Sequence, residues 1–319
     1  MSVEINSFYD RISEARDRIK GVASQTPLVE APALSKKFGR KVYLKLECYQ
    51  PIRVFKIRGA YNKVSQVSAS GVVAASSGNH GIAVAYSARR LGKRCTVVVP
   101  ETAVQEKVSA IEELGAEVVK FGRFSSEREA KARELAKRQG EFVHPFDDPE
   151  VIAGQGTCGM EIVEQLEDFD SVVVPVGGGG LISGVTVAIK ATKPSVRVFG
   201  VEPVGASKLG PSLKQGRRVA VDSPKSIADG LLPNSVGELP FRLIEGKVAG
   251  TFEVTDEEIV EAMRLLLHHA HVVAEPSGAA PLAALLAGKS AEMLGERAVF
   301  VISGGNVSLS LLRKLLGEV

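Results

Sequence analysis

The residue of this chain best suited to chemistry is a lysine that follows an aromatic residue just ahead of a helical run. The stretch Phe55-Lys56-Ile57-Arg58-Gly59-Ala60 places Lys56 among apolar neighbours. A lysine buried in such surroundings loses its charge easily and becomes a nucleophilic amine. A surface lysine on the first turn of a helix has the same local sequence, so the other motifs of the chain must decide between the two interpretations.

Four consecutive glycines, Gly177, Gly178, Gly179 and Gly180, follow one apolar run and precede a helical one. Their backbone N–H groups can surround an anion at the start of a helix. A plain turn rarely requires four residues that lose so much backbone entropy on ordering, which favours a phosphate site. The run matches neither G-x-G-x-x-G nor G-x-x-x-x-G-K-[ST], so nicotinamide and nucleoside-triphosphate sites are weaker interpretations.

Three further segments carry polar groups at expected strand or helix ends. Residues 76–81, Ser-Ser-Gly-Asn-His-Gly, offer hydroxyl and N–H donors for a carboxylate, although helix capping alone is the alternative. Ser303 follows the last apolar run and precedes Gly304-Gly305-Asn306, where a polar strand end before a turn is the alternative. Glu275 directly precedes Pro276. The alternative for this residue is an acidic side chain at a helix start, where it interacts favourably with the helix dipole.

In chain order, four of these motifs are residues 55–60, 76–81, 177–180 and 303–306. Together they resemble the motifs of pyridoxal-phosphate enzymes of fold type II, the tryptophan-synthase-like class. Within that class they are most similar to the threonine dehydratase and serine racemase family, and the resemblance covers nearly the whole chain. It implies an α/β fold with two domains, each an open, mostly parallel twisted sheet flanked by helices. The smaller domain, of about four strands at residues 48–140, would be inserted in the larger domain, residues 1–47 and 141–319.

The resemblance also implies a role for each candidate residue. Lys56 forms the Schiff base with pyridoxal phosphate, and its freed amine then takes the substrate Cα proton. In racemases of the family, the serine that matches Ser77 returns a proton on the opposite face of the cofactor, but dehydratases carry it too. The other implied cofactor contacts are Phe55, Asn79 at the 3′ oxygen, Gly177, Gly178, Gly179 and Gly180 at the phosphate, Glu275 beside the ring, and Ser303 at the pyridine nitrogen.

The substrate carboxylate is expected to lie against a second group of side chains. The resemblance places Ser76, Ser77, Asn79 and His80 there. It adds Arg128, for which the sequence alone favours a solvated charge on a helix.

Two positions depart from the family pattern. Val54 stands where the family usually has serine before the phenylalanine, which concerns the choice of substrate more than cofactor binding. Lys208 stands where cation-dependent members have an aspartate, in a segment that begins with Glu202 and contains Ala206. A lysine repels a divalent ion, so we predict no metal; either the site is lost or the Lys208 ammonium occupies it.

The predicted activity is therefore that of a threonine/serine dehydratase, an ammonia-lyase that converts L-threonine to 2-oxobutanoate and ammonia by β-elimination. Serine or other amino-acid racemisation on the same scaffold is the alternative. A β-replacement enzyme and a non-catalytic dinucleotide-binding protein fit less well. Which hydroxy-amino acid is preferred is left open by the sequence.

Composition agrees with an enzyme that acts on a small molecule. The 319 residues are 45% hydrophobic and carry a formal charge of only +3, which predicts neither a nucleic-acid nor a membrane partner. Three widely spaced cysteines, Cys48, Cys95 and Cys158, indicate a reducing cytoplasm. By resemblance, a homodimer or homotetramer is expected.

Short β-branched runs alternate with amphipathic stretches along the chain, as parallel strands covered by helices require. Thr255 before three acidic residues predicts a helix start. The expected strands are residues 42–46, 72–75, 96–99, 117–121, 172–176, 197–201 and 299–302, and the expected helices are 105–114, 127–138, 151–166 and 256–269.

Overall fold

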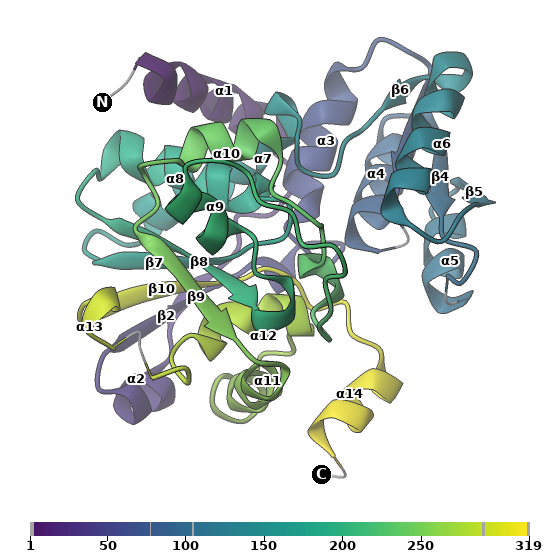
Figure 1. The fold of residues 1–319 in the computed structure, drawn as a ribbon. Coiled ribbons are helices and arrows are strands. Elements are labelled where there is room, and N and C mark those ends of the chain that lie inside the picture. The colour runs from purple at the N-terminus through teal and green to yellow at the C-terminus, as the bar shows by residue number, and fades with distance from the viewer. Residues whose placement is uncertain (1–2, 77, 104, 289–290, 318–319) are drawn as a thin grey trace.

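Two separate sheets, each covered by helices on both faces, make up the fold in the computed structural model of the chain (Figure 1). The structure describes residues 3–76, 78–103, 105–288 and 291–317. The larger sheet has six strands, and only its edge strand β1 is antiparallel to its neighbour. Its order is β1 (Leu28–Glu30), β2 (Lys41–Leu46), β10 (Arg297–Ile302), β7 (Ser171–Pro175), β8 (Arg197–Pro203) and β9 (Gly250–Val254).

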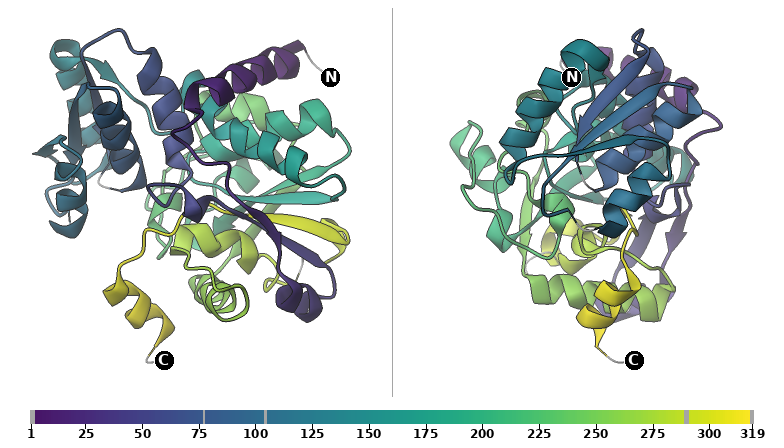
Figure 2. Two further views of the ribbon diagram at one scale, coloured as in Figure 1. Left: turned by 180° about the vertical axis from the view of Figure 1, so that it is seen from behind. Right: turned by 90° about the vertical axis from the view of Figure 1, so that its right-hand side faces the viewer.

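The smaller sheet has four parallel strands and lies beside the larger one, as the view from behind in Figure 2 shows. Its order is β5 (Glu117–Lys120), β4 (Arg94–Val99), β3 (Gly71–Ala75) and β6 (Glu141–Phe142). The α/β class with two sheets is thus confirmed. The domain boundary at residues 48 and 140 stays a proposal, and because β6 pairs with β3 we would place its second limit just after Phe142.

Helices connect the strands and cover both sheets. No helix in the described ranges combines the length and the apolar character needed to cross a membrane. The α-helices are α1 (Val3–Ile19), α2 (Pro32–Phe38), α3 (Lys56–Gln66), α4 (Asn79–Arg90), α5 (Gln105–Glu112), α6 (Ser125–Gln139), α7 (Pro149–Gln165), α8 (Gly180–Thr192), α9 (Leu209–Gln215), α10 (Glu238–Ile244), α11 (Asp256–Ala270), α12 (Pro276–Ala283), α13 (Ala291–Leu294) and α14 (Leu309–Leu316). The 3-10 helices are η1 (Glu47–Tyr49), η2 (Val204–Ala206) and η3 (Asp229–Leu231).

Strand alternation builds a core on each side of the larger sheet. In β7, Val172 and Val174 pack with α7 and α8, whereas Val173 points to the opposite face and packs with α11 and α12. β10 does the same, with Val299 on one side and Phe300 on the other. Burial on both faces explains why these strands are continuous apolar runs.

The expected strands and helices are present, with bounds that shift by a few residues. The predicted start of α11 is confirmed, because the Thr255 hydroxyl accepts the Glu258 N–H and the Glu258 carboxylate accepts the Thr255 N–H. The strands β1, β6 and β9 were not predicted. The first two are only three and two residues long, too short to show a periodic pattern.

The carboxyl ends of the parallel strands meet between the two sheets. β10 ends before Ser303, β7 ends before the glycine run, and β3 ends before Ser76. In open parallel sheets, ligands bind at this edge of the strands. The fold therefore brings the sequence motifs to one region.

Candidate active site

Lys56 begins α3, and its amine lies in the region between the two sheets. Its Nζ atom donates a 2.6 Å hydrogen bond to the carbonyl oxygen of Pro145 and lies 5.1 Å from the centre of the Phe55 ring. The side chain is half-buried, and burial lowers the pKa of Lys56 to about 8. An amine with this pKa is available as a nucleophile and as a base near neutral pH.

Backbone pairing fixes Lys56 next to Ser303. The Phe55 N–H donates to the Ser303 carbonyl at 3.0 Å, and Val54 forms an isolated antiparallel bridge with Gly304. Arg53, just before, has a left-handed φ of 59°, an unfavourable conformation that this pairing holds in place. The Val54 side chain is fully buried, so the residue that departs from the family pattern fills a dry space beside the lysine.

Asn79 connects the small sheet to the large one. It lies at the start of α4, where its Nδ2 donates to Glu275 Oε1 at 2.7 Å and its Oδ1 accepts from Asn306 Nδ2 at 2.8 Å. Burial, reinforced by the nearby charge of Asp229, raises the pKa of Glu275 to about 8. The Glu275 carboxyl is therefore largely protonated at neutral pH, and this carboxyl–amide chain adds no charge to the site.

His80 is neutral and has one free ring nitrogen. Its Nε2 donates to the Val143 carbonyl at 2.9 Å, so the lone pair is on Nδ1. Nδ1 is buried and has no partner among the described residues. Burial, with a further contribution from Lys56, lowers the pKa of His80 to about 3. His80 thus offers a buried acceptor and cannot act as an acid near neutral pH.

The four glycines form a loop whose backbone donors are free. Within the described part of the chain, the N–H groups of Gly177 to Gly180 donate to no recorded acceptor. Gly179 has a φ of 92° and caps α8, so the N–H groups lie at the positive end of that helix. The Phe146 ring lies against Gly178, where an added Cβ would come within 2.2 Å of it. Unpaired donors in a loop without room for side chains fit the phosphate of pyridoxal phosphate.

A substitution at Gly179 tests the loop. Gly179→Ala forces a side chain into left-handed backbone and places its Cβ 2.5 Å from Val236 Cγ1. Gly246→Ala is the control, because Gly246 has a φ of 68° and no atom within 4 Å of an added Cβ. We expect both to lose about 1 kcal/mol of stability from backbone strain, with about 1–3 kcal/mol more for Gly179→Ala from overpacking.

Only Gly179→Ala should also weaken the binding of pyridoxal phosphate, measured by titrating the apoprotein. If the cofactor affinities of the two variants are equal, the loop serves only as a turn.

The remaining predicted residues are less closely joined to this site. Ser76 Oγ accepts the Gly78 N–H at 3.2 Å, and Ser77 lies outside the described residues. Ser303 is 3% exposed, and no partner among the described residues is recorded for its hydroxyl. Arg128 donates to the Arg123 carbonyl and to Ser125 Oγ, so its recorded hydrogen bonds stay within its own loop and helix.

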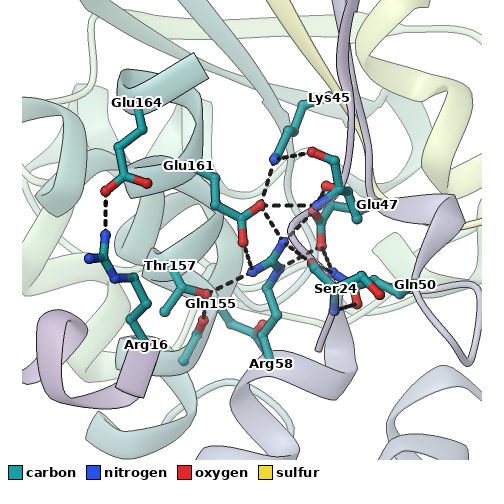
Figure 3. A network of polar contacts seen from close by, with 12 residues as sticks. Arg16, Ser24, Lys45, Glu47, Gln50, Arg58, Gln155, Thr157, Glu161 and Glu164 are labelled. Atoms are coloured by element: carbon teal, nitrogen blue, oxygen red, sulfur yellow. Dashed lines mark hydrogen bonds and ion pairs between the residues drawn. The ribbon is translucent and has the colours of Figure 1, made fainter. Parts of the chain in front are cut away.

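The sequence did not reveal the buried ion-pair network around Arg58, which lies one half-turn beyond Lys56 in α3. Arg58, two residues further along α3, is fully buried and makes paired hydrogen bonds to Glu47 and to Glu161, at 2.6 to 2.8 Å (Figure 3). Lys45 Nζ adds a 2.5 Å bond to Glu161. Paired geometry of this kind fixes orientation as well as charge. The network therefore fixes the first turn of α3, and with it the position of the lysine.

Two other partners were also missed. The Pro145 carbonyl that accepts from Lys56 carries no side-chain signal that a sequence could show. Asn306, in contrast, is part of the Ser303 motif, and its amide reaches both Asn79 and the Ile52 carbonyl. Its place in that motif was the available signal.

Fold and site together define an α/β enzyme of pyridoxal-phosphate fold type II, with a lysine of lowered pKa paired next to Ser303. The comparisons with known proteins agree. The chain belongs to the family described as "Pyridoxal-phosphate dependent enzyme", which residues 19–304 match.

Three relatives carry different activities on this fold. The chain is 43% identical to an L-threonine ammonia-lyase of Thermotoga maritima, over 96% of this chain and 77% of the relative. It is 37% identical to an L-threo-3-hydroxyaspartate ammonia-lyase of Saccharomyces cerevisiae, over 97% and 96%. The structure of maize serine racemase superimposes with a TM-score of 0.91 at 34% identity, covering 96% and 95%.

Proposed function

We propose that this chain is a threonine/serine dehydratase, an ammonia-lyase that converts L-threonine to 2-oxobutanoate and ammonia by β-elimination. The observation that carries the proposal is the Lys56 amine, half-buried, of lowered pKa, and placed next to Ser303 by backbone pairing. The L-threonine ammonia-lyase relative, at 43% identity, supports the choice of reaction.

The glycine loop and Ser303 are the residues that we assign to cofactor binding. When bound, pyridoxal phosphate supplies the electron sink that makes the substrate Cα–H acidic. The free N–H groups of the glycine loop would hold its phosphate, and the Ser303 hydroxyl would donate a hydrogen bond to its unprotonated pyridine nitrogen. Because a hydroxyl does not hold that nitrogen protonated as an aspartate does, elimination is favoured over transamination.

Lys56 performs the proton transfer. Its amine is oriented by the Pro145 carbonyl and takes the Cα proton when the amine is neutral. The N–H and hydroxyl donors of residues 76–79 bind the substrate carboxylate. Asn79 keeps this segment in place through its bonds to Glu275 and Asn306.

A substrate comparison tests the proposal. Purified holoenzyme is given L-threonine, L-serine and L-threo-3-hydroxyaspartate, and 2-oxo acid and ammonia are measured together with the chirality of residual amino acid. We expect L-threonine to give 2-oxobutanoate and ammonia in equal amounts. Faster turnover of the hydroxyaspartate would assign the chain to the other ammonia-lyase activity, and racemised serine without 2-oxo acid would make it a racemase.

The second candidate is a serine or other amino-acid racemase, which the similarity to maize serine racemase supports. We propose that Ser77, if the chain racemises serine, returns the proton on the face opposite Lys56. Ser77→Ala should then reduce D-serine formation at least ~10²-fold, the usual contribution of a positioned acid, and reduce L-threonine elimination far less. Ser76→Ala is the comparison variant: it removes a hydroxyl that we assign to carboxylate binding, so it should reduce both reactions by similar factors. An equal loss of both reactions in Ser77→Ala would assign Ser77 to carboxylate binding.

Location and assembly complete the proposal. We propose a cytoplasmic enzyme, because the three cysteines are free and buried. We propose a homodimer or homotetramer, the assembly that the family resemblance implies. Sedimentation velocity at several protein concentrations tests the assembly, and a single monomeric species would exclude it.

A further inference from the structure

A second buried lysine lies outside the catalytic centre, close behind the glycine loop. Lys208 is 0% exposed, and its Nζ donates to the carbonyl oxygens of Ala206 at 2.8 Å, Leu231 at 3.0 Å and Val176 at 3.3 Å. Glu202 Oε1 lies 3.5 Å from the same nitrogen. An ammonium has three N–H donors, and three carbonyl oxygens accept them here. The geometry is that of a charged lysine acting as a small cation among oxygen ligands.

The Glu202 carboxylate is fixed by backbone donors as well as by the ammonium. It accepts the N–H groups of Lys208, Leu209 and Gly210 at 2.9 to 3.0 Å, at the start of α9. Burial lowers the pKa of Lys208, and the Glu202 carboxylate opposes that shift. The pair is therefore complete within the protein: one positive charge, one negative charge, and oxygen or N–H partners for both.

These residues do not fit a divalent cation. The ammonium already occupies the space between the Ala206 carbonyl and the Glu202 carboxylate, the oxygens that a hard cation would need. An additional ion there would face a like charge at contact distance. Within the described ranges, no cluster of three or more His, Cys, Asp or Glu side chains could hold a metal elsewhere.

Two of the three carbonyls that Lys208 binds belong to the start of the glycine loop and to the segment packed against it. Val176 is the residue immediately before Gly177. Leu231 follows Gly230, whose carbonyl oxygen would lie 2.7 Å from a Cβ on Gly177 and whose N–H donates to Ser277 Oγ at 3.0 Å. A single ammonium thus joins the start of the loop to the segment packed against it. Losing it would leave three buried carbonyls without a partner and the Glu202 carboxylate without its counter-charge, which is costly in a dry interior.

We propose that the Lys208 ammonium is a built-in cation that holds the glycine loop in the shape that binds the cofactor phosphate, so that no divalent ion is needed. Lys208 is a positioning residue in this scheme, because it touches neither cofactor nor substrate. The inference rests on the proposed use of the glycine loop for pyridoxal phosphate.

A lysine pair provides the first test. Lys208→Met removes the ammonium and keeps an unbranched side chain that is shorter by only the terminal atom. Lys93→Met is the matched control, because Lys93 Nζ also donates to two backbone carbonyls, of Val67 at 2.7 Å and Ala69 at 3.0 Å, at the far end of the small sheet. Pyridoxal-phosphate affinity is measured by equilibrium dialysis, and the ³¹P resonance of the bound phosphate is recorded. We expect Lys208→Met to lose at least ~10-fold in affinity for pyridoxal phosphate, which equals about 1.4 kcal/mol. It should also shift the ³¹P resonance. Lys93→Met should change neither quantity.

A metal rescue provides the second test and does not require Lys208→Met to fold. Lys208→Asp places a carboxylate with Glu202 and the Ala206 carbonyl, a set of oxygen ligands suited to Mg²⁺ or Ca²⁺. Either ion should raise the melting temperature and cofactor affinity of Lys208→Asp and leave the unmodified protein unchanged, with or without chelator.

The outcomes separate the two proposals. The inference is overturned if the unmodified protein loses cofactor affinity in chelator and regains it with Mg²⁺, or if Lys208→Met binds the cofactor as Lys93→Met does. In either case the proposed function still stands, provided that the unmodified protein without chelator binds pyridoxal phosphate. An unmodified protein that binds no pyridoxal phosphate overturns both.

Discussion

Replacing Lys56 with alanine is expected to slow the formation of 2-oxobutanoate from L-threonine by on the order of 10³-fold or more, because the covalent anchor of the cofactor and the base disappear together. The visible absorbance band of the bound cofactor should be lost as well. The fold should survive, since within the described part of the chain the amine has one recorded hydrogen bond, to the Pro145 carbonyl.

A second lysine of lowered pKa serves as the control for Lys56. Burial lowers the pKa of Lys190, whose Nζ donates to the carbonyls of Pro194 and Val196 at the opposite end of α8 from the glycine loop. Lys190→Ala should keep both turnover and the absorbance band. Normal turnover by purified Lys56→Ala would exclude this lysine as the catalytic amine.

Replacing Arg58 with methionine is expected to destabilise the protein by about 3–5 kcal/mol, as removal of one partner from a buried ion pair does. Burial raises the pKa of Glu47, but the Arg58 guanidinium outweighs this effect and holds that pKa below its ordinary value. Without Arg58, Glu47 loses its direct ion pair, whereas Glu161 keeps Lys45. The free energy of unfolding, measured in urea at neutral pH, gives the size of the loss.

Two further variants show whether the loss comes from the buried charge. The double variant Arg58→Met/Glu47→Gln removes the uncompensated carboxylate and should recover part of the stability. Arg133→Met breaks the exposed pair with Glu129 and should cost less than about 1 kcal/mol. If Arg58→Met costs no more than Arg133→Met, the network does not fix the start of α3.

The motifs that the sequence could predict are local ones. The glycine loop combines unusual residue types within a few positions, so its chemistry can be read without knowing what lies beside it. Lys56 could be assigned only together with the other motifs, because a surface lysine at a helix start has the same local sequence. The strand pattern was also visible, because β7 and β10 are buried on both faces and their residues are almost all apolar.

What the sequence could not show depends on contacts between distant segments. Asn79 and Glu275 are 196 positions apart, and nothing in either motif says that they form one hydrogen-bonded chain. The partners of Arg58 lie on η1 and α7, and only the fold brings their charges together. For Lys208, the sequence left two outcomes open, and a choice between them required the carbonyl oxygens around its ammonium.

The position of β10 has a consequence for how the chain acquires its site during synthesis. This strand lies between β2 and β7, so the central strand of the large sheet comes from residues 297–302, after all its other strands. The strands of the small sheet, in contrast, all come from residues 71–142 and can pair early, because local contacts form faster than distant ones. On the ribosome, Lys56 is made long before Ser303, which closes the site beside it. A nascent chain that has not yet delivered β10 therefore contains Lys56 but has no complete cofactor site.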